Sequence, residues 1–430
     1  MYNEINRQRI HDLLKDYPIP KMIKIRQNFA RPKIEDIPNE VRKQLEQEKI
    51  LKTVKPDMRI AVTAGSRGLA NIKVIIREIC SILKEHGAKP FIVPAMGSHG
   101  GATAEGQRAI IEGYGITEEY CGVPILSSME VKYIGYTEEG HSVYIDKNAA
   151  EADGIVVVGR VKAHTDFRGP YESGIMKMMT VGLGKQYGAE NFHRTGPKYM
   201  AHKVPLYGNA IRKNAPVLFA LGIVENAYDE TCILQSMTNE EIPVIEPQLL
   251  ETAKALMGKI YFDSTDVLIV DQIGKDISGD GMDPNVTGTF STPYASGGLK
   301  AMKRVFLDLT KDTHGSMMGL GMADATTQRC FDHCDLYASY ANALTCTLFH
   351  CARIPMIFQS DKDAIQACLK YCGDNDKEHP RVIRIKDTLH LGEIWISESF
   401  LKEAEAHSDI EILSEPQEIE FDDEGYIVKE

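Results

Sequence analysis

The sequence lacks the features that would place the protein in a membrane or on a nucleic acid. Its longest apolar stretch, residues 216–224, is far shorter than the roughly 20 residues that cross a bilayer. The polar N-terminal segment has no apolar core of a secretory signal. The net charge is −12, whereas nucleic acids and anionic membranes bind basic surfaces. We therefore expect a soluble, cytoplasmic protein with neither a membrane nor a nucleic acid as its partner.

Metal-binding cysteine motifs and low-complexity runs are missing as well. None of the nine cysteines belongs to a CxxC pair. Three pairs have three or four residues between partners, which is typical of stacked helical side chains: Cys330/Cys334, Cys346/Cys351 and Cys368/Cys372. We expect free core thiols in a reducing compartment. A closed metal site made by protein side chains alone is therefore not expected.

The chain length predicts more than one core. It has 430 residues, of which 43% are hydrophobic and 26% charged. We expect an α/β fold of two α/β domains, residues 1–260 and 261–430, with mainly parallel sheets and an interdomain cleft. The acidic tail, residues 419–430, is expected to form an edge strand or to pack back on the first domain.

Hydrophobic periodicity predicts the main elements. The buried strand 58–65 leads through a Gly-rich turn into a helix over 71–86 and then a strand over 90–96, which is typical of a parallel α/β unit. Further strands are predicted at 154–160, 216–224, 266–274 and 353–361. Further helices are predicted around 249–257, 297–309 and 335–347.

Three glycine-rich turns follow predicted strands, at residues 65–68, 97–101 and 274–279. Loops between a parallel strand and the N-terminus of a helix bind anions and ligands in α/β proteins. A single loop of this kind would more simply be a turn and nothing else. Here one carries a histidine and the other two carry a cationic side chain, which favours a site. None matches the GxGxxG or Walker A patterns.

The segment 161–196 concentrates the chemistry-bearing residues. It contains His164, Asp166, Arg168, Glu172, Lys177, Lys185 and His193 among many glycines. A solvated loop would account for the charges. It would not account for the neighbouring apolar residues Met176, Met178, Met179 and Val181, which indicate a buried, shaped segment.

Taken together, four motifs resemble the nickel-pincer-dependent lactate racemase family, in a branch not assigned to lactate. They are GSRG (65–68), MGSHGG (96–101), KAHTDFRGPYESGIMK (162–177) and FH (192–193). The resemblance implies a pyridinium-3,5-bisthiocarboxylic acid mononucleotide cofactor that binds nickel through a ring carbon and two sulfurs. It implies that Lys177 carries this cofactor covalently and that His193 supplies the fourth ligand of the metal, a planar donor set that suits nickel.

The same resemblance assigns the remaining roles around the cofactor. His99 and His164 match the acid–base pair, and histidine titrates near neutrality, as proton exchange with a 2-hydroxy acid requires. Arg67 matches the arginine that binds the substrate carboxylate. The turn at Ser173 and Gly174 is expected to bind the cofactor, with its phosphate on backbone N–H groups.

The sequence also departs from the family pattern. Ala64 stands where the lactate enzymes have an aspartate, and three extra residues separate His164 from Lys177. The substrate motif of the second domain has no clear counterpart, and we expect Lys275, Asp283 and Asn285 to bind substrate in its place. Extra polar groups indicate a larger or more hydroxylated acid than lactate.

We therefore predict an isomerase, a racemase or epimerase of a small 2-hydroxy acid, that works with cofactor-synthesis and insertion enzymes. A homo-oligomer is compatible with these features. Two alternatives stay open. One is a storage protein for the nickel cofactor, which would need only Lys177 and His193. The other is a different reaction on the same cofactor, such as dehydration, with Glu172 or Asp166 as an additional acid.

Overall fold

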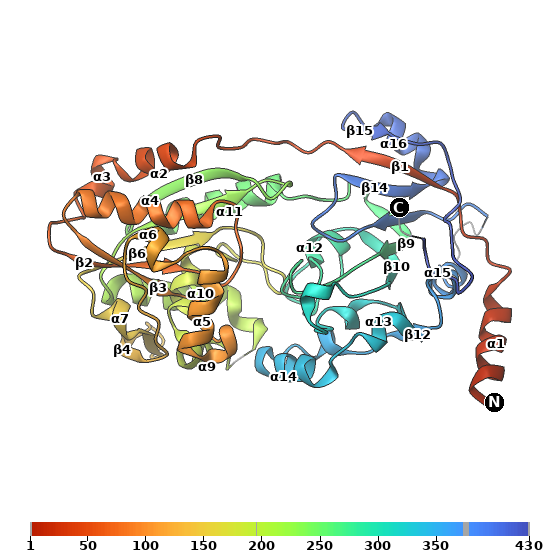
Figure 1. Cartoon of the computed structure of the whole chain (residues 1–430), viewed down its shortest axis with the longest axis horizontal. Coiled ribbons are helices and arrows are strands. Elements are labelled where there is room, and N and C mark those ends of the chain that lie inside the picture. The colour runs from red at the N-terminus through yellow and green to blue at the C-terminus, as the bar shows by residue number, and fades with distance from the viewer. Residues whose placement is uncertain (1, 195, 373–377, 429–430) are drawn as a thin grey trace. The chain divides into compact units, whose positions relative to one another are not determined.

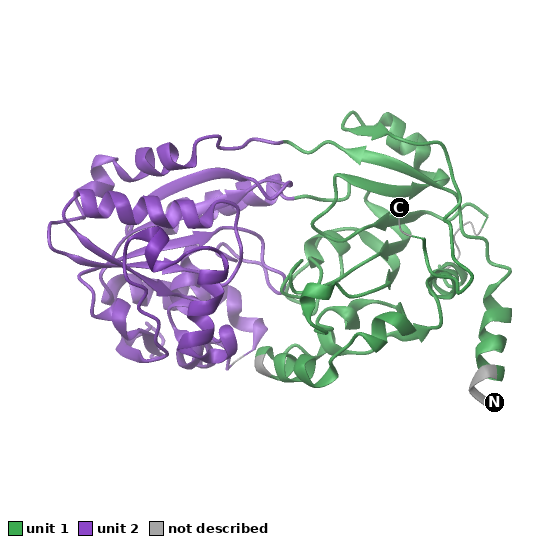
Figure 2. Cartoon of the chain, in the orientation of Figure 1, with its two compact units in different colours: residues 1–30, 258–430 green, residues 31–257 purple. Residues whose placement is uncertain are grey.

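The computed structural model describes residues 2–194, 196–372 and 378–428. The chain divides into two compact units (Figure 2). Unit 2 comprises residues 31–257, and unit 1 comprises residues 1–30 together with 258–430. Each unit is an α/β structure with a largely parallel sheet, so the predicted fold class is confirmed. The expected cleft between domains stays a prediction.

Unit 2 is built on a five-stranded sheet in the order β3-β2-β6-β7-β8. The strands β2, β3, β6 and β7 run parallel, and β8 closes one edge as an antiparallel strand. Their bounds are Arg59–Ala64, Lys89–Pro94, Gly154–Arg160, Val217–Glu225 and Thr231–Thr238 for β2, β3, β6, β7 and β8. The predicted strands of this half are confirmed. A separate hairpin joins β4 (Val131–Tyr136) and β5 (Ser142–Asp146).

Alternating residues of the strands point to two different cores, as the two-residue period of a strand requires. In β2, Ile60 and Val62 pack against α2 (Ile37–Leu45) and α4 (Ile72–Glu85). Ala61, between them, belongs to the core on the other face of the sheet. That second core is covered by α10 (Met200–Asn214), α11 (Ile242–Leu256) and the hairpin. The helices on both faces are visible in Figure 1.

Short helices occupy the connections of unit 2. They are α3 (Glu48–Leu51), α5 (Ala104–Gly113), α6 (Glu118–Cys121), α7 (Lys147–Ala150), α8 (Ile175–Lys177) and α9 (Lys185–His193). A π-helical turn over Met178–Gly182 lies between α8 and α9. Such turns are rare and often mark functional segments.

Unit 1 contains an eight-stranded sheet in the order β12-β11-β10-β9-β13-β14-β1-β15. Strands β12, β11, β10, β9 and β13 are parallel to one another, and β14, β1 and β15 continue the sheet in antiparallel pairs. The bounds, in sheet order from β12 to β15, are Met356–Phe358, Ala325–Thr327, Lys300–Phe306, Ser264–Val270, Val382–Ile385, Glu393–Ser397, Met22–Gln27 and Ile410–Ile412. Its helices are α1 (Tyr2–Leu14), α12 (Pro284–Thr287), α13 (Gln328–Asp332), α14 (Leu336–Cys346), α15 (Asp361–Lys370) and α16 (Leu401–Ala406).

The helix predicted over 297–309 is wrong, because this segment contains strand β10. Lysine, alanine, methionine and arginine at 300–304 favour helix locally. The strand nevertheless pairs with β9 on one side and β11 on the other, and this long-range pairing outweighs local propensity.

Segments from both ends of the chain pack within unit 1. Strand β1 pairs with β14 and β15, so residues 1–30 pack with 258–430, whereas the sequence assigned them to the first domain. Met22 of β1 also forms a bridge with Gln417, and the tail makes a further bridge between Phe421 and Ile427. The acidic tail thus packs on unit 1.

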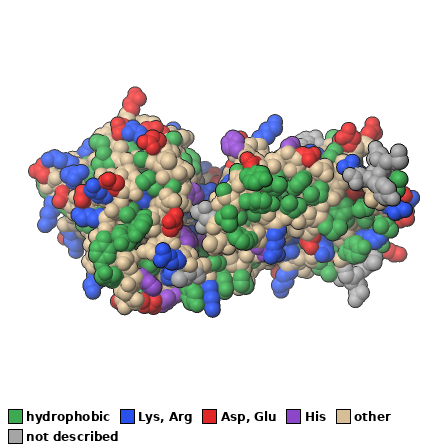
Figure 3. All heavy atoms as spheres, turned by 90° about the horizontal axis from the view of Figure 1, so that it is seen from below, with side chains coloured by type: hydrophobic (Ala, Val, Ile, Leu, Met, Phe, Trp, Pro, Cys, Tyr) green, Lys and Arg blue, Asp and Glu red, His purple; other side chains and the backbone are tan. Residues whose placement is uncertain are grey.

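Exposed apolar side chains gather on unit 1. Figure 3 shows hydrophobic side chains clustered on the face seen from below. Tyr337 and Leu344 of α14, Phe349, and Met356 of the edge strand β12 are between 62% and 87% exposed. Patches of this kind are typical of contact surfaces. Among the described residues, no helix combines the length and apolar character needed to cross a bilayer.

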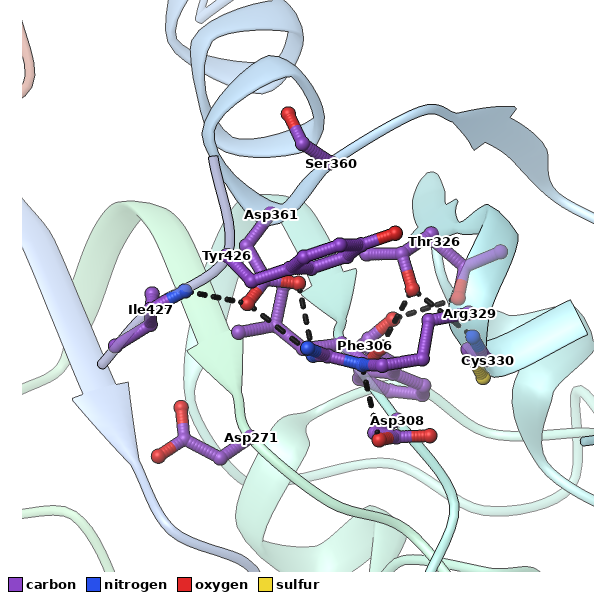
Figure 4. Close-up of polar contacts among 12 residues, drawn as sticks. Asp271, Phe306, Asp308, Thr326, Arg329, Cys330, Ser360, Asp361, Tyr426 and Ile427 are labelled. Carbon is purple, nitrogen blue, oxygen red and sulfur yellow. Dashed lines mark hydrogen bonds and ion pairs between the residues drawn. The ribbon is translucent and has the colours of Figure 1, made fainter. Parts of the chain in front are cut away.

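A buried ionic network anchors the tail of unit 1. Arg329 lies between Asp308, at 3.1 Å, and Asp361, at 3.0 Å, beneath the ring of Tyr426 (Figure 4). Asp361 also accepts the backbone N–H of Ile427 at 2.9 Å. One arginine therefore joins the ends of two parallel strands to the tail.

Replacing Arg329 with methionine should destabilise unit 1. The side chain of Asp361 is only 1% exposed, and loss of its partner leaves a buried carboxylate uncompensated. We expect the free energy of unfolding to fall by about 3 kcal/mol. Urea unfolding followed by the fluorescence of Trp395, the single tryptophan, reports on this unit. Lys15→Met, which breaks an exposed pair with Asp12, is the matched control, and an equal effect of both variants would contradict the buried role.

Candidate functional site

Three of the four sequence motifs meet at one edge of the unit 2 sheet. Strand β2 lies between β3 and β6 and is parallel to both. The carboxyl ends of these strands therefore lie side by side. Arg67 follows β2, His99 follows β3, and the segment with His164 and Lys177 follows β6. The side chains of Arg67 and His99 are exposed at this edge.

The segment that follows Lys177 contacts the two neighbouring loops. A Cβ at Gly65 would lie 3.0 Å from the methyl carbon of Met178, so the GSRG turn packs directly on this segment. The N–H of Gly97 donates to the carbonyl of Gly182 at 3.1 Å. Gly97 has a φ of +59°, which favours glycine at this close approach. The three motifs thus form one continuous structure.

His164 and Lys177 are in direct contact through Nε2 and Nζ. The other ring nitrogen, Nδ1, accepts a hydrogen bond from the backbone N–H of Asp166 at 3.0 Å. The carboxylate of Asp166 lies 3.6 Å from the same nitrogen. Asp166 therefore offers Nδ1 a donor when this nitrogen is unprotonated and an acceptor when it is protonated. The ring of His164 also packs against Phe167, with centroids 4.5 Å apart.

The environment of His164 favours its neutral form. Burial lowers its pKa well below 6.5, and the cations Lys177, Lys162 and Arg168 lower it further. His193 contributes to the same shift, so it lies within electrostatic range of His164. A neutral imidazole at pH 7 can accept a proton.

His193 has the hydrogen bonding of a metal-binding histidine. Its Nδ1 is 2.7 Å from the carbonyl oxygen of Ala189, which can only accept, so Nδ1 carries the proton. The lone pair is then on Nε2. Burial lowers the pKa of His193, and Lys177 lowers it further, which keeps the ring neutral. No group of three or more His, Cys, Asp or Glu able to hold a metal occurs in the described part of the chain.

Glu172, one of the residues brought by the three-residue insertion, is an anchor of the His164 loop. Its buried carboxylate accepts the N–H of His164 at 2.8 Å. Lys254 of α11 lies 3.0 Å from the other oxygen, and Arg168 lies at 3.5 Å. Arg168 also donates to the carbonyl of His164 at 2.6 Å. Because Glu172 is committed to these contacts, its role as an additional catalytic acid is disfavoured.

Glu246 of α11 anchors the turn before Lys177, and the sequence analysis missed it. Both of its carboxylate oxygens accept the N–H of Met176, at 3.0 and 3.2 Å. A Cβ at Gly174 would lie 2.1 Å from Glu246, so only glycine fits there. The one available signal was a single carboxylate in an otherwise apolar stretch of α11, between Pro243 and Pro247.

The backbone N–H groups that were predicted to bind the cofactor phosphate have other partners in the structure. The N–H of Ser173 donates to the carbonyl of Lys162, and the N–H of Met176 is taken by Glu246. In this conformation neither amide is left for a phosphate. The turn at Ser173 and Gly174 therefore positions Lys177, and its role in binding the cofactor itself stays a prediction.

The Arg67 loop is held from both sides. The hydroxyl of Tyr114 donates to the carbonyl of Ser66 at 2.9 Å, and Glu225 accepts the N–H of Ala70 at 2.8 Å. Arg160, at the end of β6, lies 2.6 Å from the same Glu225. The Arg67 loop is thus tied to two polar side chains outside the motifs, Tyr114 and Glu225.

The predicted substrate residues of the second domain lie in unit 1, after β9. The N–H of Lys275 donates to Thr313 at 3.0 Å. Asp283 caps α12 by accepting from the backbone of Asn285 at 2.9 Å and from its side chain at 2.8 Å. Asp283 thus has a local structural role, and the binding roles of these residues stay predictions.

The N-terminal half matches a known family. Residues 13–199 match the family model of the lactate racemase N-terminal domain. The matched range contains Arg67, His99, His164, Lys177 and His193. The resemblance to lactate racemases that the motifs indicated is thereby confirmed for this N-terminal range.

Two solved structures are similar to the chain. A protein from Thermotoga maritima has a TM-score of 0.47 and 14% identity, over 65% of this chain and 71% of that one. The lactate racemase apoprotein from Thermoanaerobacterium thermosaccharolyticum has a TM-score of 0.45 and 15% identity, over 84% of each chain. Similarity at this level carries no argument about function. No curated protein matches the sequence.

Glu246 should make the stability of unit 2 depend on pH. Burial raises its pKa from 4.5 to about 8. An acid whose pKa is higher in the folded than in the unfolded state stabilises the fold fully when the pH is below its pKa in the unfolded chain. This contribution is lost as the pH rises to its pKa in the folded protein. The free energy of unfolding of the wild type should therefore fall relative to Glu246→Gln between pH 4.5 and about 8, measured by urea unfolding with circular dichroism.

A second substitution separates the charge from the hydrogen bonds. Glu246→Leu removes the acceptor of the Met176 N–H and should be about 1–3 kcal/mol less stable than Glu246→Gln at every pH, because neither variant titrates at this position. Equal pH dependence in the wild type and Glu246→Gln would show that Glu246 is not the titrating group.

Proposed function

We propose that this protein is an isomerase that racemises or epimerises a 2-hydroxy acid, with a nickel-pincer nucleotide carried by Lys177. The observation that carries the proposal is the contact between Lys177 and His164, with His193 nearby, at the strand edge that also bears Arg67 and His99. The family match over residues 13–199 supports a relation to lactate racemases.

The residues present fit such a cofactor. His193 has its lone pair on Nε2 and a lowered pKa, as a neutral imidazole ligand requires. Nickel with three donors from the cofactor would need only one from the protein. When bound, this cofactor would supply the acceptor for the hydride that leaves C2 of the substrate.

The side chains of the protein would handle the proton and the carboxylate. His99 and His164 each exchange a proton with the substrate hydroxyl, one for each enantiomer. The carboxylate of Asp166, 3.6 Å from Nδ1 of His164, would stabilise the imidazolium that forms. Arg67 would bind the substrate carboxylate through its two-pronged guanidinium.

The sequence predicts three substrate-binding residues in unit 1. We retain Lys275, Asp283 and Asn285 for this role, with Lys275 as the cation. We further infer a cytoplasmic location and dependence on cofactor-synthesis enzymes. The engagement of Glu172 by Lys254 speaks against dehydration with Glu172 as the acid. Storage of the cofactor would need only Lys177 and His193, and it would leave His99 and His164 without a role.

Variants of the three central residues test the proposal. In protein produced together with the cofactor-synthesis enzymes, Lys177→Ala should lose the covalent adduct in intact mass spectra. His99→Ala and His164→Ala should keep the adduct but lose roughly 10²–10⁴-fold in racemisation across a panel of 2-hydroxy acids. The exposed residues Lys198 and His202 provide matched controls as Lys198→Ala and His202→Ala. Full activity of both catalytic-histidine variants would refute the assigned roles, and loading without turnover in the wild type would favour storage.

The protonation of His164 can be measured without substrate. Its pKa lies well below 6.5, mainly because of burial, so the ring should stay neutral as the pH is lowered through 6.5. Proton–carbon NMR titration of the apoprotein, with His164→Gln to assign the resonance, gives the value directly. Titration of this resonance at or above pH 6.5 would be inconsistent with the buried environment.

A further inference from the structure

Lys185 is a buried lysine in an unfavourable position. It is the first residue of α9, the helix that ends at His193, and its side chain is 0% exposed. Its φ is +54°, in the left-handed region that non-glycine residues rarely adopt. A cation at a helix N-terminus also opposes the helix dipole. Burial, backbone strain and dipole all disfavour lysine here, so α9 itself gains nothing from it.

The ammonium group of Lys185 is surrounded by three acceptors. It donates to the carbonyl of Pro94 at 2.5 Å and to Oε1 of Gln107 at 3.0 Å, and it lies 3.1 Å from the carboxylate of Asp146. Two of the three N–H groups of the ammonium are thus used in hydrogen bonds, and the carboxylate of Asp146 forms an ion pair with it. Burial lowers the pKa of Lys185, and Asp146 raises it again in part.

Gln107 continues this network to the loop that carries His99. Its Nε2 donates to the carbonyl of Gly97 at 2.8 Å and to that of His99 at 3.3 Å. Gln107 is itself fully buried. Because Lys185 fixes Oε1, the amide of Gln107 is oriented with its donors toward the loop.

We propose that Lys185 and Gln107 are positioning residues that hold the His99 loop and the His193 helix in one arrangement. Lys185 joins three elements: the end of β3, the hairpin strand β5 through Asp146, and α9. Through Gln107 it also reaches the backbone on both sides of Ser98. The importance of Lys185 and Gln107 for turnover rests on the proposed function. Their effect on the order of the His99 loop does not depend on it.

Gln107→Glu tests the connection between Lys185 and the His99 loop with the smallest change in the side chain. Glutamate keeps an acceptor for Lys185 but loses the N–H donors to Gly97 and His99. In apoprotein, we expect the protected amides of His99, Ala102 and Thr103 to exchange roughly three- to tenfold faster, with the strands of unit 1 unchanged. Hydrogen exchange with mass spectrometry measures this, and Gln186→Glu, at an exposed glutamine of α9, is the control. Unchanged exchange in the loop would overturn the proposal.

Lys185→Met tests the contribution of the lysine ammonium group itself. We expect faster amide exchange both in residues 97–103 and in α9. Uniformly faster exchange throughout unit 2 would indicate a merely structural role and overturn the proposal. If Lys185→Met does not fold, Gln107→Glu and Gln107→Leu still decide the question. In loaded protein, Gln107→Glu should lower kcat with KM and the covalent adduct retained. If the variants exchange faster in the loop but the loaded wild type shows no turnover, the positioning role is supported and the proposed function is rejected.

Discussion

The parallel pairing of β2 with both β3 and β6 is the constraint on which the candidate site depends. It brings together three loops that are separated by up to about a hundred residues in sequence, because parallel strands that share an edge end at the same side of the sheet. Arg67, His99 and Lys177 owe their proximity to this pairing. Without it, the glycine-rich turns would be unrelated surface features.

Strand pairing places the loops, but buried polar side chains orient them. Glu246 holds the turn before Lys177, Glu172 holds the loop of His164, and Lys185 acts through Gln107 on the loop of His99. Buried ionisable and polar groups are expensive in stability unless they are hydrogen-bonded. Their concentration beneath one sheet edge indicates that this part of unit 2 is organised for precise positioning of side chains rather than for stability alone.

The same environment favours the neutral form of two histidines in the candidate site. Exclusion of water lowers the pKa of His164 and of His193, so both rings are neutral, as the proposed metal binding and proton acceptance would require. Their hydrogen bonds then separate the roles. Nδ1 of His193 is committed to a carbonyl, whereas Nδ1 of His164 faces a residue that offers both a donor and an acceptor.

The sequence by itself determined the α/β class, the four parallel strands of unit 2 and the loops that bear Arg67, His99, His164 and Lys177. These are local signals, because hydrophobic period, glycine turns and short motifs are written in neighbouring residues. Only the tertiary structure decided the features that depend on distant partners. Strand pairing made residues 300–306 a strand and drew residues 1–30 into unit 1. The anchors Glu246 and Gln107 became recognisable only when folding brought them against loops far away in sequence, because a polar residue on an apolar helix shows its need for a partner but not which partner it finds.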